Sequence, residues 1–175
     1  TRMSQYKRNY VKGGTYFFTV NLYNRKKTYL IDHIDLLRTA VAKVKQKHPF
    51  IINAWVVLPD HLHTVWTLPP DDADFSTRWR EIKKAFTKSL PIKEPLTVTQ
   101  TKKGKRAIWQ KRFWEHTITS TADYNHHIDY VHLNPLKHGL VSQVKDWPYS
   151  SFHRDVKNGL YPQDWCGTAK QKEET

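Results

Sequence analysis

The chain has little cysteine, little glycine and few acidic residues, and these shortages narrow its class. Cys166 is the only cysteine among 175 residues, so no internal disulfide can form, in keeping with a reducing cytosol. Apolar runs are only a few residues long and no charged-then-apolar leader opens the chain, which argues against a membrane span or signal peptide. The six glycines make no loop of the kind that cradles nucleotide phosphates. We therefore expect a soluble, cytoplasmic protein with no membrane partner.

The shortage of acidic residues leaves a large excess of positive charge. Lys and Arg number 29 against 16 Asp and Glu, a formal net charge of +13. Such an excess on a small domain attracts polyanions and favours phosphate backbones through counterion release. The 7 Trp and 9 Tyr offer rings that can stack on unpaired bases. Nucleic acid is the expected partner; the alternative is a well-filled core under a merely solvated basic surface.

Apolar periodicity predicts an α+β fold. Alternation over 15–22 and 113–118, and apolar runs over 51–58 and 61–68, predict four strands. Helical spacing predicts one helix capped by Asp32 that ends before His48, and another that begins near Phe75 and has a basic outer face. Strand, helix, strand, strand, helix, strand is the order of a ferredoxin-like, or split βαβ, antiparallel sheet with helices on one face. The other face remains for a ligand or for further helices.

Two segments fall outside this periodic pattern. Residues 91–108 carry two prolines and a basic cluster, which predicts a mobile basic loop inside the domain. Residues 140–175 form a C-terminal extension, with a short helix expected from about 150 to 158 and closed by Gly159. The length fits one unit, so we expect residues 1–175 to form a single domain.

The apolar run over 51–58 leads into Pro59-Asp60-His61-Leu62-His63. Because alternate residues of a strand share a face, His61 and His63 would lie side by side while Leu62 points into the core. Two neighbouring imidazoles can grip a metal ion. The alternative is a pair of surface or hydrogen-bonded histidines on an edge strand.

A later helix carries a tyrosine that can address the same metal. Ser120 is its predicted N-cap, and we expect it to run to about Asn134. Its apolar face holds Tyr124, Ile128 and Val131. A polar face about 140° round the helix holds Asp123, His126, Tyr130 and Asn134. If the helix crosses the histidine strand, Tyr130 and Asn134 can contact one phosphate. The alternative is that Tyr130 is a half-buried ring with a solvent-exposed hydroxyl.

Four blocks of the sequence together resemble a known family. They are 57–63, 80–84, 112–116 and 129–141. These blocks are similar to the signatures of REP-associated tyrosine transposases, which are bacterial single-tyrosine HUH nucleases related to the transposases of small single-strand-moving insertion sequences. The resemblance runs from Tyr6 to about Gly167, nearly the whole chain.

The resemblance implies an HUH-nuclease core that cleaves and rejoins single-stranded DNA with a divalent metal, Mg²⁺ or Mn²⁺. It implies repetitive extragenic palindromes, folded as hairpins, as the substrate, and a protein that works at the nucleoid as a monomer or a homodimer. Carried over position by position, it makes Tyr130 the nucleophile, which would form a 5′-phosphotyrosine link. The implied metal ligands are His61, His63 and Asn134, and the substitutes for the third are Glu115, His116 and His132.

Other residues must supply the DNA surface. The basic candidates are Lys7, Arg8, Lys12, Lys84, Lys111 and Arg112, and the candidates for stacking on bases are Phe17 and Trp114. Two rival functions remain open. One is a non-catalytic module that binds single-stranded hairpins through aromatics on its sheet, and the other is a metal-dependent hydrolase that uses water and leaves no covalent intermediate.

Overall fold

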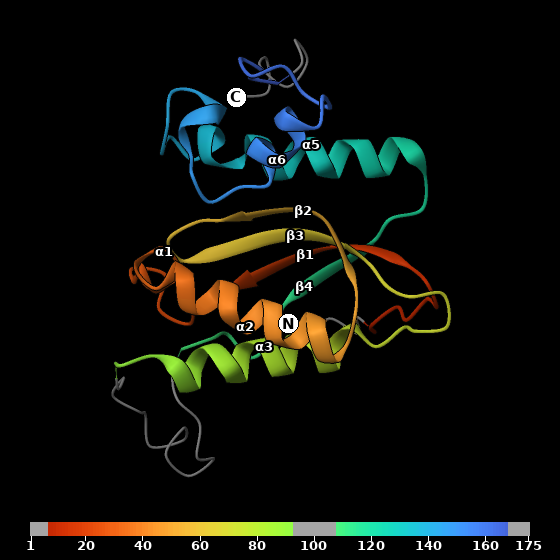
Figure 1. Ribbon diagram of the computed structural model, residues 1–175. Coiled ribbons are helices and arrows are strands. Elements are labelled where there is room, and N and C mark those ends of the chain that lie inside the picture. Colours follow the sequence, from red (N-terminus) through yellow and green to blue (C-terminus); the bar gives the residue numbers. More distant parts are fainter. Residues whose placement is uncertain (1–6, 93–107, 168–175) are drawn as a thin grey trace, which may run out of the picture.

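A computed structural model describes residues 7–92 and 108–167, in which four strands form one antiparallel sheet (Figure 1). The strands are β1 (Thr15–Asn21), β2 (Ile51–Val57), β3 (His61–Thr67) and β4 (Trp114–Thr117). Their order across the sheet is β2-β3-β1-β4, with β1 and β3 as the central pair. This is the strand order of the ferredoxin-like fold, so the predicted α+β class is confirmed.

Two long helices, α2 (Ile34–Lys47) and α3 (Phe75–Ser89), cover one face of the sheet (Figure 1). The side chains of β1 that alternate toward them, from Tyr16 to Val20, are buried in a shared core. Trp66 of β3 and Trp79 of α3 stack there with ring centroids 4.3 Å apart. The alternating side chains of β1 therefore point in turn into this apolar core and toward the opposite face of the sheet.

One predicted cap is wrong. The sequence predicts Asp32 as the N-cap of α2, but Asp32 is the last residue of a short helix, α1 (Tyr29–Asp32), and the residue before α2 is His33. The Asp32 carboxylate accepts a hydrogen bond from the Thr28 hydroxyl at 2.6 Å instead. Asp32 accepts this bond instead of capping α2 because Thr28, four residues earlier, lies one helical turn away from it.

Helix α5 (Thr121–Lys137) lies across the other face of the sheet (Figure 1). Ser120 caps it, as predicted, by accepting a hydrogen bond from the Asp123 backbone N–H. Ile128 and Val131 pack against Phe17 of β1 and the apolar residues of β2 and β3. The sheet is thus buried on both faces, and α5 is the layer that the histidine strand faces.

Helix α5 is longer than the sequence predicts. It was expected to end near Asn134, but it runs to Lys137 with Pro135 inside it. A proline this close to the end costs only one helical hydrogen bond, and the His138 N–H still bonds the Asn134 carbonyl at 3.0 Å. The helix ends at Lys137, and Gly139, just beyond the C-cap residue His138, has a φ of 71°, which suits the left-handed position after a helix.

The C-terminal part packs behind α5. It contains a 3₁₀ turn, η1 (Val144–Asp146), and the predicted short helix, α6 (Phe152–Lys157), and Phe152 is buried with Leu133 and Val144. Most of the segment 91–108, predicted to be a mobile loop, lies outside the described residues. Among the helices that the structure describes, none is long and apolar enough to cross a membrane.

Candidate active site

The two histidines of β3 form the centre of the candidate site. Their ring centroids lie 5.0 Å apart, and both side chains are buried beneath α5. Leu62 between them points into the core on the opposite face. The strand alternation thus pairs the imidazoles as the sequence predicts, and it aims them at the helix that carries Tyr130.

Hydrogen bonds from neighbouring residues fix how each imidazole can act. The Nδ1 of His61 lies 2.8 Å from Asp60 Oδ1, and the Nδ1 of His63 lies 2.8 Å from the hydroxyl of Thr19, its register partner on β1. The Asp60 carboxylate can only accept, so His61 donates its Nδ1–H and keeps a free lone pair on Nε2; His63 is in the same state when its Nδ1–H donates to the Thr19 hydroxyl. Asp60 and Thr19 escaped the sequence analysis, although Asp60 stands beside His61 in the motif and could have been found there.

Burial keeps both imidazoles neutral. It lowers the pKa of His63 to about 3, with the nearby positive groups adding to the effect. Burial also lowers the pKa of His61, and Asp60 opposes part of that shift. Burial works to raise the pKa of Asp60 itself, but hydrogen bonds from Arg25 and His61 hold it below its usual value. The site therefore offers two unprotonated nitrogens beside a carboxylate that stays ionised at neutral pH.

Tyr130 projects from α5 onto this pair. Its ring centroid lies 5.4 Å from that of His63, in an edge-on arrangement. Phe17 of β1 lies against both rings, 5.5 Å from His63 and 5.7 Å from Tyr130. The Nζ of Lys137, two turns along the helix, lies 5.2 Å from the centre of the Tyr130 ring and brings a positive charge close to the phenol. Sequence spacing had not singled out Lys137.

Asn134 occupies the next position along the same helix face and is completely buried. Both its amide oxygen and its amide nitrogen lack a hydrogen-bond partner among the described residues. One turn further, the ring of His138 lies 5.3 Å from that of His61. Tyr130, Asn134 and His138 are spaced four apart, so they line one stripe above the histidine pair. A buried amide with no partner is costly, and a bound cation or phosphate at this stripe would satisfy it.

The other residues considered as third ligands face elsewhere. Glu115 is buried on the α3 side of the sheet, where Arg8 approaches its carboxylate at 4.0 Å. His132 bonds the Ser151 hydroxyl at 2.8 Å behind α5. His116 pairs with Asp123 at 2.9 Å. Of the four candidates, only Asn134 follows Tyr130 on the same helix face, and His138, which the sequence analysis missed, lies one turn beyond it, next to His61.

The orientation of two neighbouring histidines on α5 differs from the predicted polar face. His126 is exposed, and it is His127 that turns toward the sheet, with its ring 4.9 Å from that of Phe17. A helix advances about 100° per residue, so His127 lies about 40° from buried Val131, whereas His126 lies about 140° away. The contact with the sheet is centred closer to Val131 than the polar pattern alone indicated.

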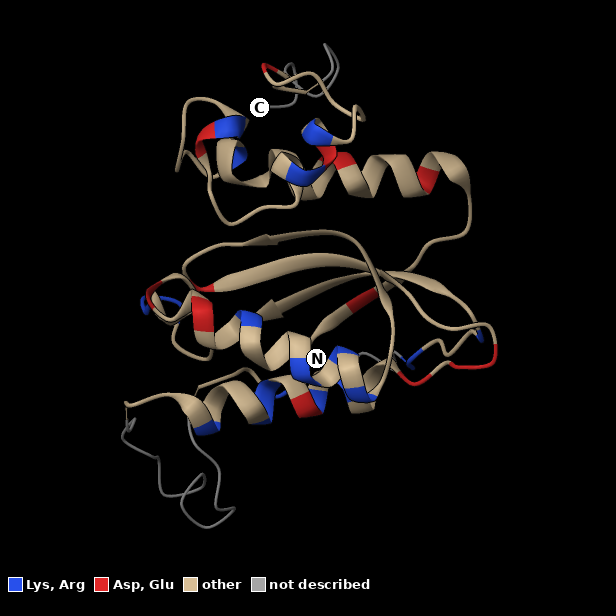
Figure 2. Ribbon diagram, viewed as in Figure 1, with Lys and Arg blue, Asp and Glu red and all other residues tan. Residues whose placement is uncertain are grey.

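The residues expected to bind DNA differ in their exposure. Lys7, Lys12, Lys84, Lys111 and Arg112 are exposed. Trp114 is 55% exposed on the edge strand, whereas Phe17 is buried under α5 and closed to a base in this structure. The Arg8 guanidinium lies 4.0 Å above the Phe113 ring. Figure 2 shows Lys and Arg spread along α2 and α3, while α5 is nearly free of them.

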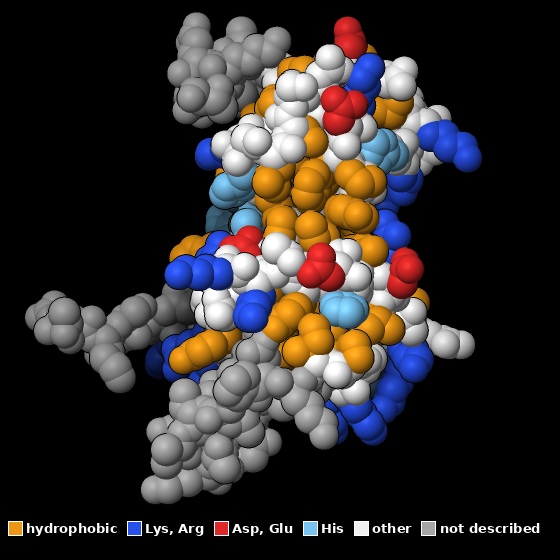
Figure 3. Space-filling model, turned by 90° about the vertical axis from the view of Figure 1, so that its left-hand side faces the viewer, with side chains coloured by type: hydrophobic (Ala, Val, Ile, Leu, Met, Phe, Trp, Pro, Cys, Tyr) orange, Lys and Arg blue, Asp and Glu red, His pale blue; other side chains and the backbone are white. Residues whose placement is uncertain are grey.

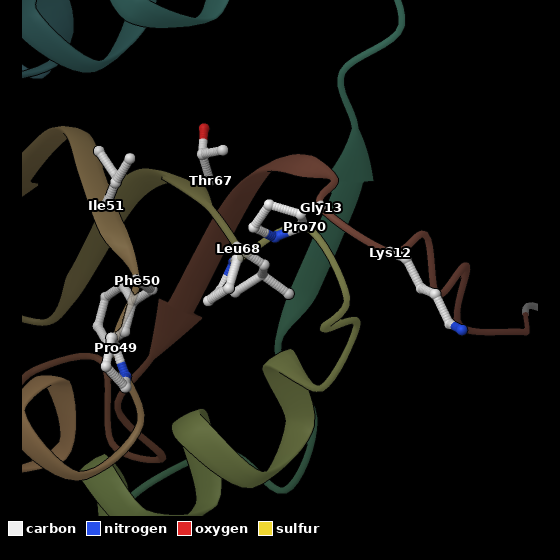
Figure 4. A pocket seen from close by; sticks show the side chains of 9 residues that line it. Lys12, Gly13, Pro49, Phe50, Ile51, Thr67, Leu68 and Pro70 are labelled. Atoms are coloured by element: carbon white, nitrogen blue, oxygen red, sulfur yellow. The ribbon is translucent and has the colours of Figure 1, made fainter.

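A separate pocket lies at the far end of β3. It has a volume of about 660 Å³ and is lined by Lys12, Gly13, residues 49–51 and residues 67–70. Its labelled side chains are mostly apolar, and Lys12 lies to one side of them (Figure 4). The histidines occupy the opposite end of the same strand. Lacking titratable groups that converge, this pocket does not compete with the histidine site.

The surface beside the histidine end of the sheet is mixed in character. Figure 3 shows histidine side chains at the margin of a band of hydrophobic ones, which lies between the sheet layer and the C-terminal helices. Ile31, Val141 and Tyr149 are partly buried and pack against the core under α5. The histidine pair itself lies between the sheet and α5, with only 5% of each residue exposed.

Known proteins resemble this chain in both sequence and structure. No family model matches the chain. Over 94% of its length it is 57% identical to a REP-associated tyrosine transposase of Escherichia coli (strain K12), of which it covers 92%. A Haemophilus influenzae protein provisionally described in the same words is 45% identical, with 97% of each chain covered. The solved structure of a REP-associated tyrosine transposase bound to a REP hairpin is 56% identical and superposes with a TM-score of 0.82, over 95% of this chain and 93% of that one.

Proposed function

Because the chain belongs to the REP-associated tyrosine transposases, a family of enzymes, we propose that it cleaves and rejoins single-stranded DNA at repetitive extragenic palindromes folded as hairpins. The solved relative is bound to a REP hairpin, and the net charge of +13 suits the same partner here. One observation carries the proposal: Tyr130 of α5 lies edge-on to His63, beside a second buried imidazole. A protein with this substrate would work in the cytoplasm, at the nucleoid.

Tyr130 is the proposed nucleophile. Its phenolic oxygen attacks the scissile phosphorus and the bond from phosphorus to the 3′ oxygen breaks, which gives a 5′-phosphotyrosine and a free 3′-hydroxyl. The phenol loses its proton to water at or before the attack, and the departing 3′ oxygen gains one. Attack by a second 3′-hydroxyl reverses the step, rejoins the strands and frees Tyr130, so no nucleotide is consumed.

The residues fit a divalent cation, Mg²⁺ or Mn²⁺. His61 and His63 would hold it through their Nε2 atoms, and Asn134 through its amide oxygen. Support for the fit comes from the free Nε2 lone pair of His61, from the neutral ring of His63 beside it, and from the buried Asn134 amide that has no partner among the described residues. The bound cation would polarise a non-bridging phosphate oxygen. Imidazole ligands favour Mn²⁺ over Mg²⁺.

The protein positions the nucleophile through packing. Phe17 of the sheet packs against the ring of Tyr130, and the Lys137 Nζ lies 5.2 Å from the centre of that ring. The Lys137 ammonium would attract the scissile phosphate and help to hold it against the phenol. Exposed Lys111, Arg112 and Trp114 precede and begin the edge strand, and they offer a path for the unpaired strand.

Covalent capture tests the proposal. A 3′-labelled REP hairpin oligonucleotide is incubated with the protein and Mn²⁺, run on a denaturing gel, and any peptide-DNA adduct is located by mass spectrometry. We expect wild type to form the adduct and Tyr130→Phe to lose it while still binding the hairpin. The matched control is Tyr124→Phe, which removes a hydroxyl from the same helix at a residue packed against the core, and it should keep the adduct.

Other outcomes reject the proposal in distinct ways. An adduct that persists in Tyr130→Phe means that another residue is the nucleophile. Free cleaved ends without any adduct indicate a hydrolase that uses water. Tight binding of the hairpin by wild type with neither cleavage nor adduct, in both Mg²⁺ and Mn²⁺, indicates a non-catalytic hairpin-binding module.

A further inference from the structure

A second group of metal-ligating side chains lies toward the start of α5. His116 of β4, with Asp123 and His127 of α5, bring one ligand atom each to within 4.8 Å of one another. His116 Nε2 is 2.9 Å from Asp123 Oδ2, and His127 Nδ1 is 3.1 Å from Asp123 Oδ1. We propose that these three residues form a second divalent-cation site, separate from the one at His61 and His63.

The local sequence brings the three residues together. In β4 the alternation sends Glu115 into the core on the α3 side, so His116 faces α5. Only three residues separate the end of β4 from the first residue of α5, and this short connection folds the helix back over the strand. Asp123 and His127 are four residues apart and therefore lie one above the other on the side of the helix that meets His116.

The donor set suits a transition-metal ion. Two imidazole nitrogens and one carboxylate oxygen are ligands for Zn²⁺, Co²⁺ or Mn²⁺. With metal-ligand bonds of about 2.0–2.2 Å, ligand atoms of a tetrahedral shell lie roughly 3.3–3.5 Å apart. The two separations to the Asp123 carboxylate are already close to this, and the two rings are stacked with centroids 4.6 Å apart. Binding therefore requires only small side-chain movements.

The site is accessible and has its own supporting contacts. The side chains of His116, Asp123 and His127 are 39%, 20% and 18% exposed, so an ion can enter from solvent and a water can complete the shell. The Thr119 backbone N–H donates to Asp123 Oδ2 at 3.1 Å and orients the carboxylate. His127 Nδ1–H now donates to the Asp123 carbonyl at 2.8 Å, so binding the cation through Nδ1 requires the other tautomer of the neutral ring, with the proton transferred through solvent to Nε2.

An ion at this site would fasten α5 to the edge of the sheet. It would bond to β4 on one side and to two successive turns of α5 on the other, just before the turn that carries Tyr130. Phe17 links the two regions, because its ring lies 4.9 Å from that of His127 and 5.7 Å from that of Tyr130. The site would thus be structural, and its existence does not depend on the chemistry proposed for Tyr130.

Removing the first site isolates the second. The full-length His61→Ala/His63→Ala protein, freed of metal, is titrated with Co²⁺ and Zn²⁺, and binding is followed by calorimetry, by visible absorption of Co²⁺ and by the shift in Tm. We expect one ion per chain to remain bound, with the absorption of low-symmetry Co²⁺ and a higher Tm. Adding His127→Ala, or separately Asp123→Asn, should abolish the binding and the Tm shift.

A neighbouring histidine provides the matched control. His126 is exposed on the same helix but outside the cluster, so His126→Ala in the same background should bind as before. Circular dichroism of each metal-free variant establishes that it is folded. If the His61→Ala/His63→Ala protein binds no ion, the three residues are only a hydrogen-bonded strap and the inference falls. It also falls if His127→Ala and Asp123→Asn bind as well as their parent, or if His126→Ala loses the ion.

Discussion

Asp60 orients His61, so replacing it tests whether the paired imidazoles bind metal. Its Oδ1 accepts the Nδ1–H of His61 at 2.8 Å, which points Nε2 toward the space below α5. Asp60→Asn removes the negative charge that supports this tautomer. Losing an outer-shell partner of a metal-bound histidine typically weakens metal binding by roughly 10- to 100-fold, or about 1.4–2.7 kcal/mol. We expect Asp60→Asn to weaken Mn²⁺ binding by this factor.

Arg25 increases the expected loss. Its Nε lies 2.5 Å from Asp60 Oδ2 and its Nη2 lies 3.4 Å from His61 Nδ1. Without the carboxylate, the guanidinium charge would act uncompensated on the imidazole and oppose a bound cation. Arg25→Gln should therefore restore part of the affinity in the Asp60→Asn background, while it changes little alone because the arginine is half exposed. In a double-mutant cycle the two changes should therefore be non-additive, with the double variant losing less affinity than the sum of the single variants.

Calorimetric titration with Mn²⁺ measures these effects, in a His127→Ala background so that the second cluster does not contribute. Asp35→Asn is the matched control, because that carboxylate is 95% exposed on α2. At low Mn²⁺ the Asp60→Asn protein should also form the DNA adduct more slowly, and saturating Mn²⁺ should restore most of the rate. Equal Mn²⁺ affinity in Asp60→Asn and Asp35→Asn would show that His61 is not a metal ligand.

Three further changes probe the site and its surroundings. Asn134→Leu removes a buried amide that has no partner among the described residues, so chemical denaturation without metal should show equal or higher stability, by up to about 1–3 kcal/mol. The same variant should lose Mn²⁺-dependent adduct formation. A fall in both stability and adduct formation would mean that the amide is a structural group. Burial lowers the pKa of His132 to about 3, below its value in the unfolded chain. The neutral ring therefore contributes stability that is fully present above about pH 6.5. The free energy of unfolding should fall by at most about 1.4 kcal/mol per pH unit as the pH drops toward 3. The free energy of unfolding, measured at several pH values, should depend less steeply on pH in His132→Gln, whose amide can still bond Ser151. An unchanged slope would show that His132 does not contribute to the pH dependence of stability. Trp114→Ala should weaken hairpin binding by about 1–3 kcal/mol in a fluorescence anisotropy titration if a base stacks on it, whereas Tyr23→Ala, which removes another exposed ring, should have little effect.

The sheet and the histidine pair were predictable because local patterns decide them. Alternation in β1 and β3 places each side chain on one face whatever the rest of the chain does, and the two-residue turn at Pro59 and Asp60 holds β2 beside β3. The spacing of Tyr130 and Asn134 likewise follows from helical geometry alone. The resemblance to the family rests on these same blocks.

Other parts of the site depend on how α5 is rotated on the sheet, which no local pattern specifies. The choice between His126 and His127 depends on the angle at which Val131 enters the core, and the proximity of His138 to His61 depends on the helix continuing through Pro135. Thr19 reaches His63 only because of the register between β1 and β3. These are tertiary contacts, and they appear in the sequence only as unremarkable polar residues.

The rotation of α5 also explains why Tyr130 stays beside His63 although no hydrogen bond to its hydroxyl is found among the described residues. Ile128 and Val131, on either side of it, are buried against the sheet. Turning the helix enough to lift Tyr130 away from His63 would expose both side chains. Burying such a side chain contributes about 1.5–3 kcal/mol, so the turn would cost on the order of 3–6 kcal/mol. The position of the phenol is therefore set by apolar packing, as the proposed role of its oxygen as a nucleophile requires.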